Sequence, residues 1–103
     1  MSFAEFAASL KRDSPPSGNW SRALTALWLD GRGDWEAAHA AAQEDSTADG
    51  AWVHAYLHRK EGDGSNAGYW YARAARSRPA DDLSLEDEWE QIVRGLLGDP
   101  QKA

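Results

Sequence analysis

The chain contains no cysteine, which excludes disulfides, thiolate catalysis and cysteine-ligated zinc or iron–sulfur sites. Positive charge is also scarce, because 11 Lys and Arg face 17 Asp and Glu and leave a formal net charge of -6. This deficit argues against a general affinity for nucleic-acid phosphates or anionic membranes. No apolar run approaches the roughly 20 residues that span a bilayer, and the first residues do not resemble a signal peptide. We therefore expect a cytoplasmic protein that binds neither nucleic acid nor membrane.

What the sequence does contain is enough apolar material for one small domain. Hydrophobic residues make up 42% of the 103 residues, so a packed core is expected over the whole chain, 1–103. Tryptophan is abundant, with 6 residues. Large aromatic side chains serve first as core material and second as contact surfaces for partners. Exposed Trp would also allow a homo-oligomer.

Apolar residues recur at helical spacing in six segments, and no segment alternates with period two, which predicts an all-α fold. The first helix is expected over 3–12, behind a capping box formed by Ser2 and Glu5, and a Pro- and Ser-containing linker follows over 13–19. Ser65 is the expected N-cap of the fifth helix, and Pro79 is expected to end it. The remaining boundaries predict two antiparallel helix pairs and a last helix: 20–30 with 34–44 (pair 20–44), 48–61 with 66–76 (pair 48–77), and 84–97.

Two segments repeat the order helix, glycine turn, helix, and their Gly-Asp dipeptides at Gly33 and Gly62 lie 29 residues apart. The pattern resembles a tetratricopeptide repeat, in which small residues let two antiparallel helices approach closely and an aromatic residue fills the space beyond them. The second copy carries Ala55, Gly62, Ala67, Tyr71, Ala74 and Pro79 at the matching offsets. The first copy carries Ala26, Gly33, Trp35 and Ala38. The segment from Trp52 to Tyr71 is also similar to small microbial proteins, a likeness that implies no function.

This resemblance implies a short stack of helix hairpins with flanking helices at each end. It also places Trp52, Tyr56, Arg59 and Lys60 along a groove-facing side of their helix, with Asn66 and Arg73 as further donors on the next helix. Arg and Lys at such positions bind carboxylates, and aromatic neighbours add flat apolar contact area. A peptide tail, a protein partner or a small acidic ligand is the expected occupant of this groove. The alternative is a solvated charged face.

Histidine supplies a second candidate site. His54 and His58 are spaced i, i+4 and share a helix face, which Glu61 extends. In an antiparallel hairpin His39 lies opposite His54, with Glu36 near the level of His58. Imidazole and carboxylate ligands suit zinc or another transition metal, and a histidine paired with a carboxylate also suits general base catalysis. The alternative is that these histidines only pack between helices with their hydrogen bonds satisfied.

The two sites predict different classes of function. The groove predicts a binding module without a cofactor. The histidines predict a metal-binding protein or a small enzyme, with His54, His58 and Glu61 as catalytic candidates and with Glu36 and the three histidines, His39, His54 and His58, as metal ligands. The chain has no glycine-rich phosphate loop and no serine in a nucleophile motif, so an enzyme is the less favoured reading.

Overall fold

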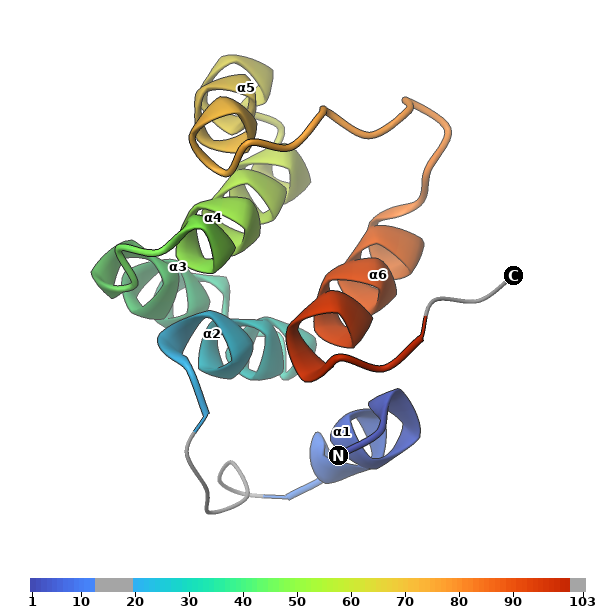
Figure 1. Cartoon of the computed structure of the whole chain (residues 1–103). Coiled ribbons are helices and arrows are strands. Elements are labelled where there is room, and N and C mark those ends of the chain that lie inside the picture. Colours follow the sequence, from blue (N-terminus) through green and yellow to red (C-terminus); the bar gives the residue numbers. More distant parts are fainter. Residues whose placement is uncertain (13–19, 101–103) are drawn as a thin grey trace.

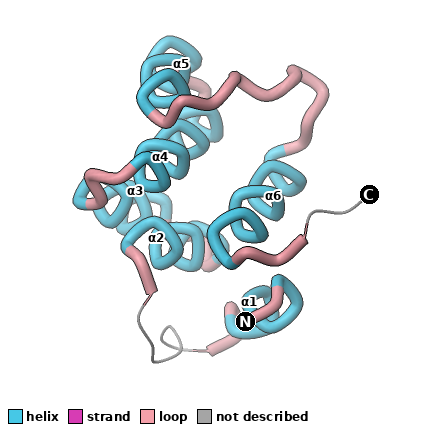
Figure 2. Tube along the Cα trace, in the orientation of Figure 1, coloured by secondary structure: helices cyan, strands magenta, loops and turns pink. Residues whose placement is uncertain are grey.

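The computed structural model describes residues 1–12 and 20–100, and this part of the chain is all-helical (Figures 1 and 2). Its helices are α1 (Phe3–Ser9), α2 (Arg22–Gly31), α3 (Trp35–Glu44), α4 (Ala48–Glu61), α5 (Gly64–Arg73) and α6 (Leu85–Leu97). The linker expected over 13–19 lies outside the described residues. In the described part of the chain, no helix is both long and apolar enough to cross a membrane.

Side-chain caps fix where most helices begin. Ser2 and Glu5 form the expected capping box at α1, and Ser84 accepts a hydrogen bond from the backbone N–H of Asp87 at α6. The predicted start of the second helix at 20 is wrong by two residues, because Ser21 caps α2. The first helix also ends earlier than expected, at Ser9, and residues 10–12 form a turn.

The expected cap of the fifth helix is wrong as well, because Asp63 and not Ser65 caps α5. The Asp63 side chain accepts a hydrogen bond from the backbone N–H of Asn66, 3.2 Å away. Asp34 caps α3 in the same way, through the N–H of Ala37. Both aspartates follow a glycine in the left-handed region, Gly33 at φ 86° and Gly62 at φ 89°. The repeated Gly-Asp pair is therefore a repeated turn that ends one helix and caps the next.

The fifth helix ends before Pro79, at a turn that the sequence did not predict. Ala75 adopts the left-handed conformation with φ 57°, and the N–H of Arg76 donates to the carbonyl of Tyr71 at 3.0 Å. This is the hydrogen bond of a Schellman motif, which normally carries glycine at the left-handed position. An alanine there is strained, because its Cβ crowds the following carbonyl.

Replacing Ala75 with glycine is therefore expected to raise the free energy of unfolding by about 1 kcal/mol. The matched control is Ala40→Gly, an exposed position in the interior of α3. There glycine should lower the free energy of unfolding by roughly 0.5–1 kcal/mol, because the helix interior favours alanine. Urea unfolding of both variants measures the difference. If the two changes have the same sign, Ala75 is not strained in solution.

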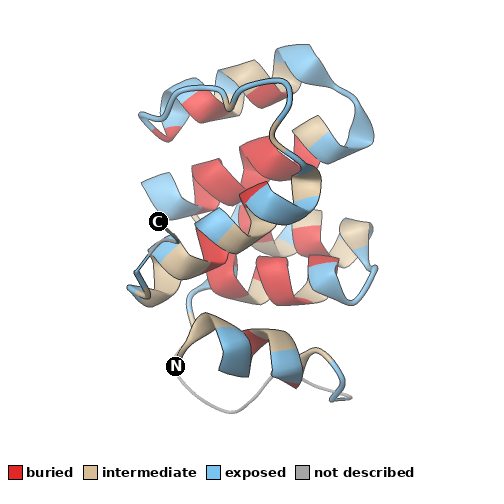
Figure 3. Cartoon of the chain, turned by 90° about the vertical axis from the view of Figure 1, so that its right-hand side faces the viewer, coloured by how far each residue is buried: buried red, intermediate tan, exposed pale blue. Residues whose placement is uncertain are grey.

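Four of the helices pack as two hairpins, and the last helix lies beside them. α2 pairs with α3, α4 pairs with α5, and α3 also contacts α4 (Figure 1). Four alanines of the repeat pattern, which is expected to let paired helices approach closely, are fully buried: Ala26, Ala38, Ala55 and Ala67. α4 is the central element, since every residue from Gly50 to His58 is buried. Figure 3 shows the buried residues gathered in the middle of the molecule, with exposed residues on the outer helices.

The last helix lies along the side of the hairpins. α6 contacts α1, α2 and α4, so it covers the first helix of each pair (Figure 1). The approach to α4 is close at Gly95, where an added Cβ would lie 3.0 Å from the indole of Trp52. On its other side α6 supports α1, whose Phe6 packs against the rings of Trp20 and Trp89. The packing of α6 therefore determines which side chains of α4 remain exposed to solvent.

Candidate functional site

Three histidines from two helices meet between α3 and α4. His54 Nε2 lies 2.9 Å from His39 Nε2, so one nitrogen donates its proton and the other accepts it. His58, one turn along α4, stacks on the His54 ring with the ring centroids 4.8 Å apart. The three residues offer nitrogen atoms that all lie within 4.8 Å of one another. His54 and His58 are buried and His39 is partly exposed, so the cluster lies just below the surface.

Two tryptophans enclose this histidine cluster. The indole of Trp35 stacks on His39 with ring centroids 4.9 Å apart, and that of Trp70 stacks on His54 at 4.0 Å. Trp35 is also held in place by its Nε1–H, which donates to the carbonyl of Leu57 at 2.9 Å. These contacts fix the planes of two imidazoles. Sequence reasoning did not assign Trp35 or Trp70 to the site, although Trp35 is spaced i, i+4 from His39 on one helix.

A carboxylate holds the third histidine. Glu61 Oε1 lies 2.6 Å from His58 Nδ1, which leaves Nε2 as the ring atom of His58 without a carboxylate partner. Glu61 and Asp63 also form a second group of possible metal ligands around His58, on the exposed side of the site. Glu36 is exposed and belongs to neither group of closely spaced ligand atoms among the described residues. The structure therefore brings together four of the five residues named for this site.

The environment favours the neutral form of two of the histidines. Burial, with smaller contributions from the neighbouring His39 and His58, lowers the pKa of His54 to about 4. Burial and His58 also lower the pKa of His39, and Glu61 partly opposes this. A neutral imidazole keeps a nitrogen lone pair for a metal ion or for a proton. At neutral pH His39 and His54 therefore present uncharged nitrogen ligands.

The lowered pKa of His54 predicts an acid-sensitive fold. In the unfolded chain the imidazole has an ordinary pKa near 6.5, whereas in the native protein it stays neutral down to about pH 4. The unfolded state therefore binds more protons in this window, and the free energy of unfolding falls as the pH is lowered through it. The full loss should be about 3 kcal/mol. Urea unfolding of chelator-treated protein between pH 7 and 5 measures the upper part of this change.

The matched control for the pH series is His54→Gln, which removes the titrating group and keeps a polar side chain. We expect its stability to depend less on pH between 7 and 5 than that of the wild type. His39 and His58 face the same position and Glu61 lies beside them, so part of the dependence should persist. An unchanged slope in the variant would contradict the assignment to His54.

The basic residues predicted to face a groove are engaged inside the protein. Arg59 donates to Glu88 of α6 at 2.8 Å and to the carbonyl of Leu83. Lys60 forms an ion pair with Asp30 of α2 at 2.8 Å. Glu88 and Asp30 are both buried, so each cation neutralises a carboxylate with little exposure to water. These pairs are possible because α6 and α2 flank α4.

The other predicted groove residues lie in different places. Trp52 is buried under α6 and carries the guanidinium of Arg76 over its ring, 3.3 Å from the centroid. The Tyr56 hydroxyl donates to Asp30 at 3.2 Å. Asn66 contacts Asp63 at the start of α5. Arg73 lines a separate cavity of about 270 Å³ together with His54 and Trp70. The structure therefore does not gather the six residues at one site.

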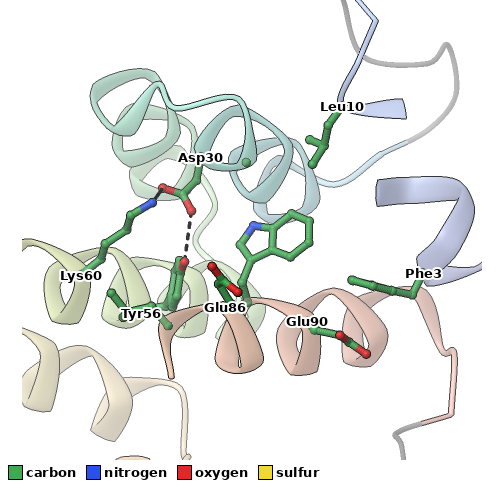
Figure 4. A pocket seen from close by; sticks show the side chains of 10 residues that line it. Phe3, Leu10, Asp30, Tyr56, Lys60, Glu86 and Glu90 are labelled. Atoms are coloured by element: carbon green, nitrogen blue, oxygen red, sulfur yellow. Dashed lines mark hydrogen bonds and ion pairs between the residues drawn. The ribbon is translucent and has the colours of Figure 1, made fainter. Parts of the chain in front are cut away.

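Tyr56 and Lys60 do line a larger cleft, of about 570 Å³, between α1, α2, α4 and α6 (Figure 4). Asp30 lies inside it, with the Tyr56 hydroxyl and the Lys60 ammonium both directed at its carboxylate. The cleft is also lined by apolar and acidic side chains: Phe3, Leu10, Leu85, Glu86, Trp89 and Glu90. Sequence reasoning missed this cleft, because its lining comes from four segments that are far apart in the chain.

Comparisons with models of known protein families, with curated proteins and with solved structures find no match to this chain. The likeness to a tetratricopeptide array therefore stays a prediction from the sequence pattern. The function has to be argued from the site itself.

Proposed function

We propose that the protein binds a transition metal ion, with zinc as the expected metal, through His39, His54 and His58. The observation that carries this proposal is the convergence of three imidazoles, with His39 Nε2 and His54 Nε2 only 2.9 Å apart. A cluster of this kind offers nitrogen ligands of the type that zinc prefers. A metal ion between the two nitrogens would replace this hydrogen bond, and the histidine that now donates it would carry its proton on Nδ1 instead.

The spacing supports tetrahedral coordination after small rotations of the rings. Zn–N distances of 2.0–2.1 Å place tetrahedral ligand atoms about 3.3 Å apart. The ligand atoms of the three histidines lie within 4.8 Å of one another, so they would have to shift by an ångström or two at most. Three protein ligands leave a fourth position for water or for an external ligand, as in catalytic zinc sites.

Glu61 fits the role of a residue that positions the third ligand. Metal-bound histidines usually donate their other ring N–H to a carboxylate or carbonyl, which fixes the tautomer and the ring plane. Glu61 occupies that place at His58 Nδ1, with 2.6 Å between the two atoms. His58 Nε2 is then the atom directed to the metal. The stacked indoles of Trp35 and Trp70 limit rotation of the other two rings.

The test is calorimetric titration of zinc into untagged, chelator-treated full-length protein. We expect one zinc per chain for the wild type and loss of this binding in His39→Gln, whose partial exposure makes the substitution mild for folding. Glu61→Gln should weaken binding by about 10–100-fold, as is typical for a carboxylate behind a ligand. Glu36→Gln is the matched control, an exposed carboxylate near the site that should bind zinc as the wild type does.

Two outcomes would overturn the metal proposal. One is the absence of stoichiometric zinc binding by the wild type. The other is unchanged zinc binding in both His39→Gln and His54→Ala, with circular dichroism showing that both variants remain helical. Either result would leave the three histidines as packing residues whose hydrogen bonds are satisfied within the protein.

Arg73 supports a second candidate, the binding of a peptide tail or small acidic ligand. Within the described residues its guanidinium has no carboxylate partner; it contacts the Tyr69 hydroxyl at 3.2 Å and the rings of Tyr69 and Trp70. It lines the cavity of about 270 Å³ that His54 also lines. An acidic ligand there would pair with Arg73. Titration of a short peptide ending in glutamate into wild type and Arg73→Ala tests this, and equal binding by both would contradict it.

A further inference from the structure

We propose that the cleft between α1, α2, α4 and α6 binds a small organic cation, an amine with an apolar body, on Asp30, Glu86 and the aromatic wall formed by Phe3 and Trp89. This site is distinct from the histidine cluster and does not depend on the proposed metal. The cleft, at about 570 Å³, has the size of a small-molecule site, and its lining joins apolar surface with a few polar groups.

The walls of the cleft are apolar and set by close packing. Phe3 and Leu10 come from α1 and the turn that follows it, and Leu85 and Trp89 come from α6. The Trp89 indole is fixed by its Nε1–H, which donates to the carbonyl of Leu27 at 3.0 Å. A Cβ at Gly31 would lie 2.9 Å from Leu10 and 3.1 Å from Trp89, so the glycine allows these side chains to meet. The apolar body of a ligand would contact this wall.

Two cations of the protein already contact groups that line the cleft, which shows the chemistry that these groups accept. The Lys60 ammonium lies 2.8 Å from Asp30 Oδ1 (Figure 4). The guanidinium of Arg94 lies over the ring of Phe3, 4.8 Å from its centroid. A carboxylate and an aromatic face are the usual partners of an ammonium group.

The charges that remain favour a cation over an anion. Asp30 and Lys60 neutralise each other, and Glu90 is paired with Arg94 at 2.8 Å. Glu86, at the edge of the cleft in Figure 4, is exposed and has no ion-pair partner among residues 1–12 and 20–100. The charged side chains that line the cleft, Asp30, Glu86 and Glu90 against Lys60, therefore leave it net negative. Lys60 is long and its side chain is 37% exposed, so it can turn outward and leave Asp30 to an incoming ammonium.

The experiment titrates benzylamine, benzyl alcohol and benzoate into ¹⁵N-labelled full-length protein and follows its amide and indole N–H signals. The three probes share one ring and differ in charge. We expect saturable shifts at the Trp89 indole N–H and the Gly31 amide with benzylamine. Benzyl alcohol should bind about tenfold more weakly or worse, since it lacks a charge-assisted hydrogen bond. Benzoate should not bind. Trp89→Phe identifies the indole signal.

Two substitutions test the named carboxylates. Glu86 is exposed, so Glu86→Gln should not affect folding. The substitution should weaken benzylamine binding several-fold and leave benzyl alcohol binding unchanged. Glu36→Gln makes the same charge change away from the cleft and should alter the binding of neither probe. Lys60→Met should strengthen benzylamine binding, because the ligand then takes the vacated place at Asp30. Equal affinity for benzylamine and benzyl alcohol, shifts confined to other parts of the molecule, or equal benzylamine binding by Glu86→Gln and wild type would overturn the proposal.

Discussion

Replacing Glu88 with alanine is expected to lower the free energy of unfolding by about 3–5 kcal/mol, a large share of the stability of a small domain. Glu88 is only 3% exposed. It accepts a hydrogen bond from the Tyr71 hydroxyl at 2.5 Å and pairs with Arg59 at 2.8 Å. Without the carboxylate, a buried hydroxyl and a largely buried guanidinium both lose their partner, and each such loss is costly.

The Glu88 network joins α4, α5 and α6, so its removal should act on the whole fold. Burial and the bond to Glu88 raise the pKa of Tyr71, which shows how strongly the neutral hydroxyl is held. Glu88→Gln keeps the size and one acceptor oxygen and should cost less than alanine. Glu86→Ala, two residues earlier but exposed, should change stability by no more than about 0.5 kcal/mol.

Urea unfolding followed by circular dichroism measures all three variants of α6. A loss below about 1 kcal/mol in Glu88→Ala, within the range of ordinary surface substitutions, would contradict the buried network. If Glu88→Ala does not fold, Glu88→Gln is compared with Glu86→Ala instead. We expect Glu88→Gln to lose more unfolding free energy than Glu86→Ala.

Zinc is expected to raise the melting temperature by roughly 15–30 °C when its free concentration is a thousand times the dissociation constant. A ligand that binds only the native state adds about 4.1 kcal/mol at that excess, and each kcal/mol shifts the melting temperature of a domain this small by about 4–8 °C. The native state alone holds His39, His54 and His58 together, so the stabilisation should depend on all three. Differential scanning fluorimetry of chelator-treated protein measures the shift.

Magnesium is the control for the thermal shift. It prefers oxygen ligands in octahedral geometry and should leave the melting temperature unchanged. His39→Gln should show little zinc-dependent shift, whereas Glu36→Gln should respond as the wild type does. A similar shift with zinc in wild type and His39→Gln would mean that zinc binds elsewhere, for example at exposed carboxylates.

The sequence determined the helices, because periodicity, caps and glycine turns are local. The fourth helix was expected over 48–61 and α4 has those bounds. The turn chemistry was readable at Gly62, whose left-handed φ only glycine adopts easily. Errors arose where two residues competed for one local role. Asp63 outcompeted Ser65 as a cap, and Ala75 ended α5 in a conformation that its residue type does not suggest.

The sequence also predicted that the histidines lie close together. Two of them are spaced i, i+4 on one helix, and a short hairpin turn joins that helix to the one that carries His39. Only the tertiary structure decided the rest. α6 packs on α4 and places Glu88 at Arg59, and α2 packs on α4 and places Asp30 within reach of Lys60. Those partners lie 29 and 30 residues apart in the chain, and no local pattern reports them. Local hydrogen bonds determine where each helix begins and ends, whereas the burial of apolar faces determines which charged side chains remain exposed.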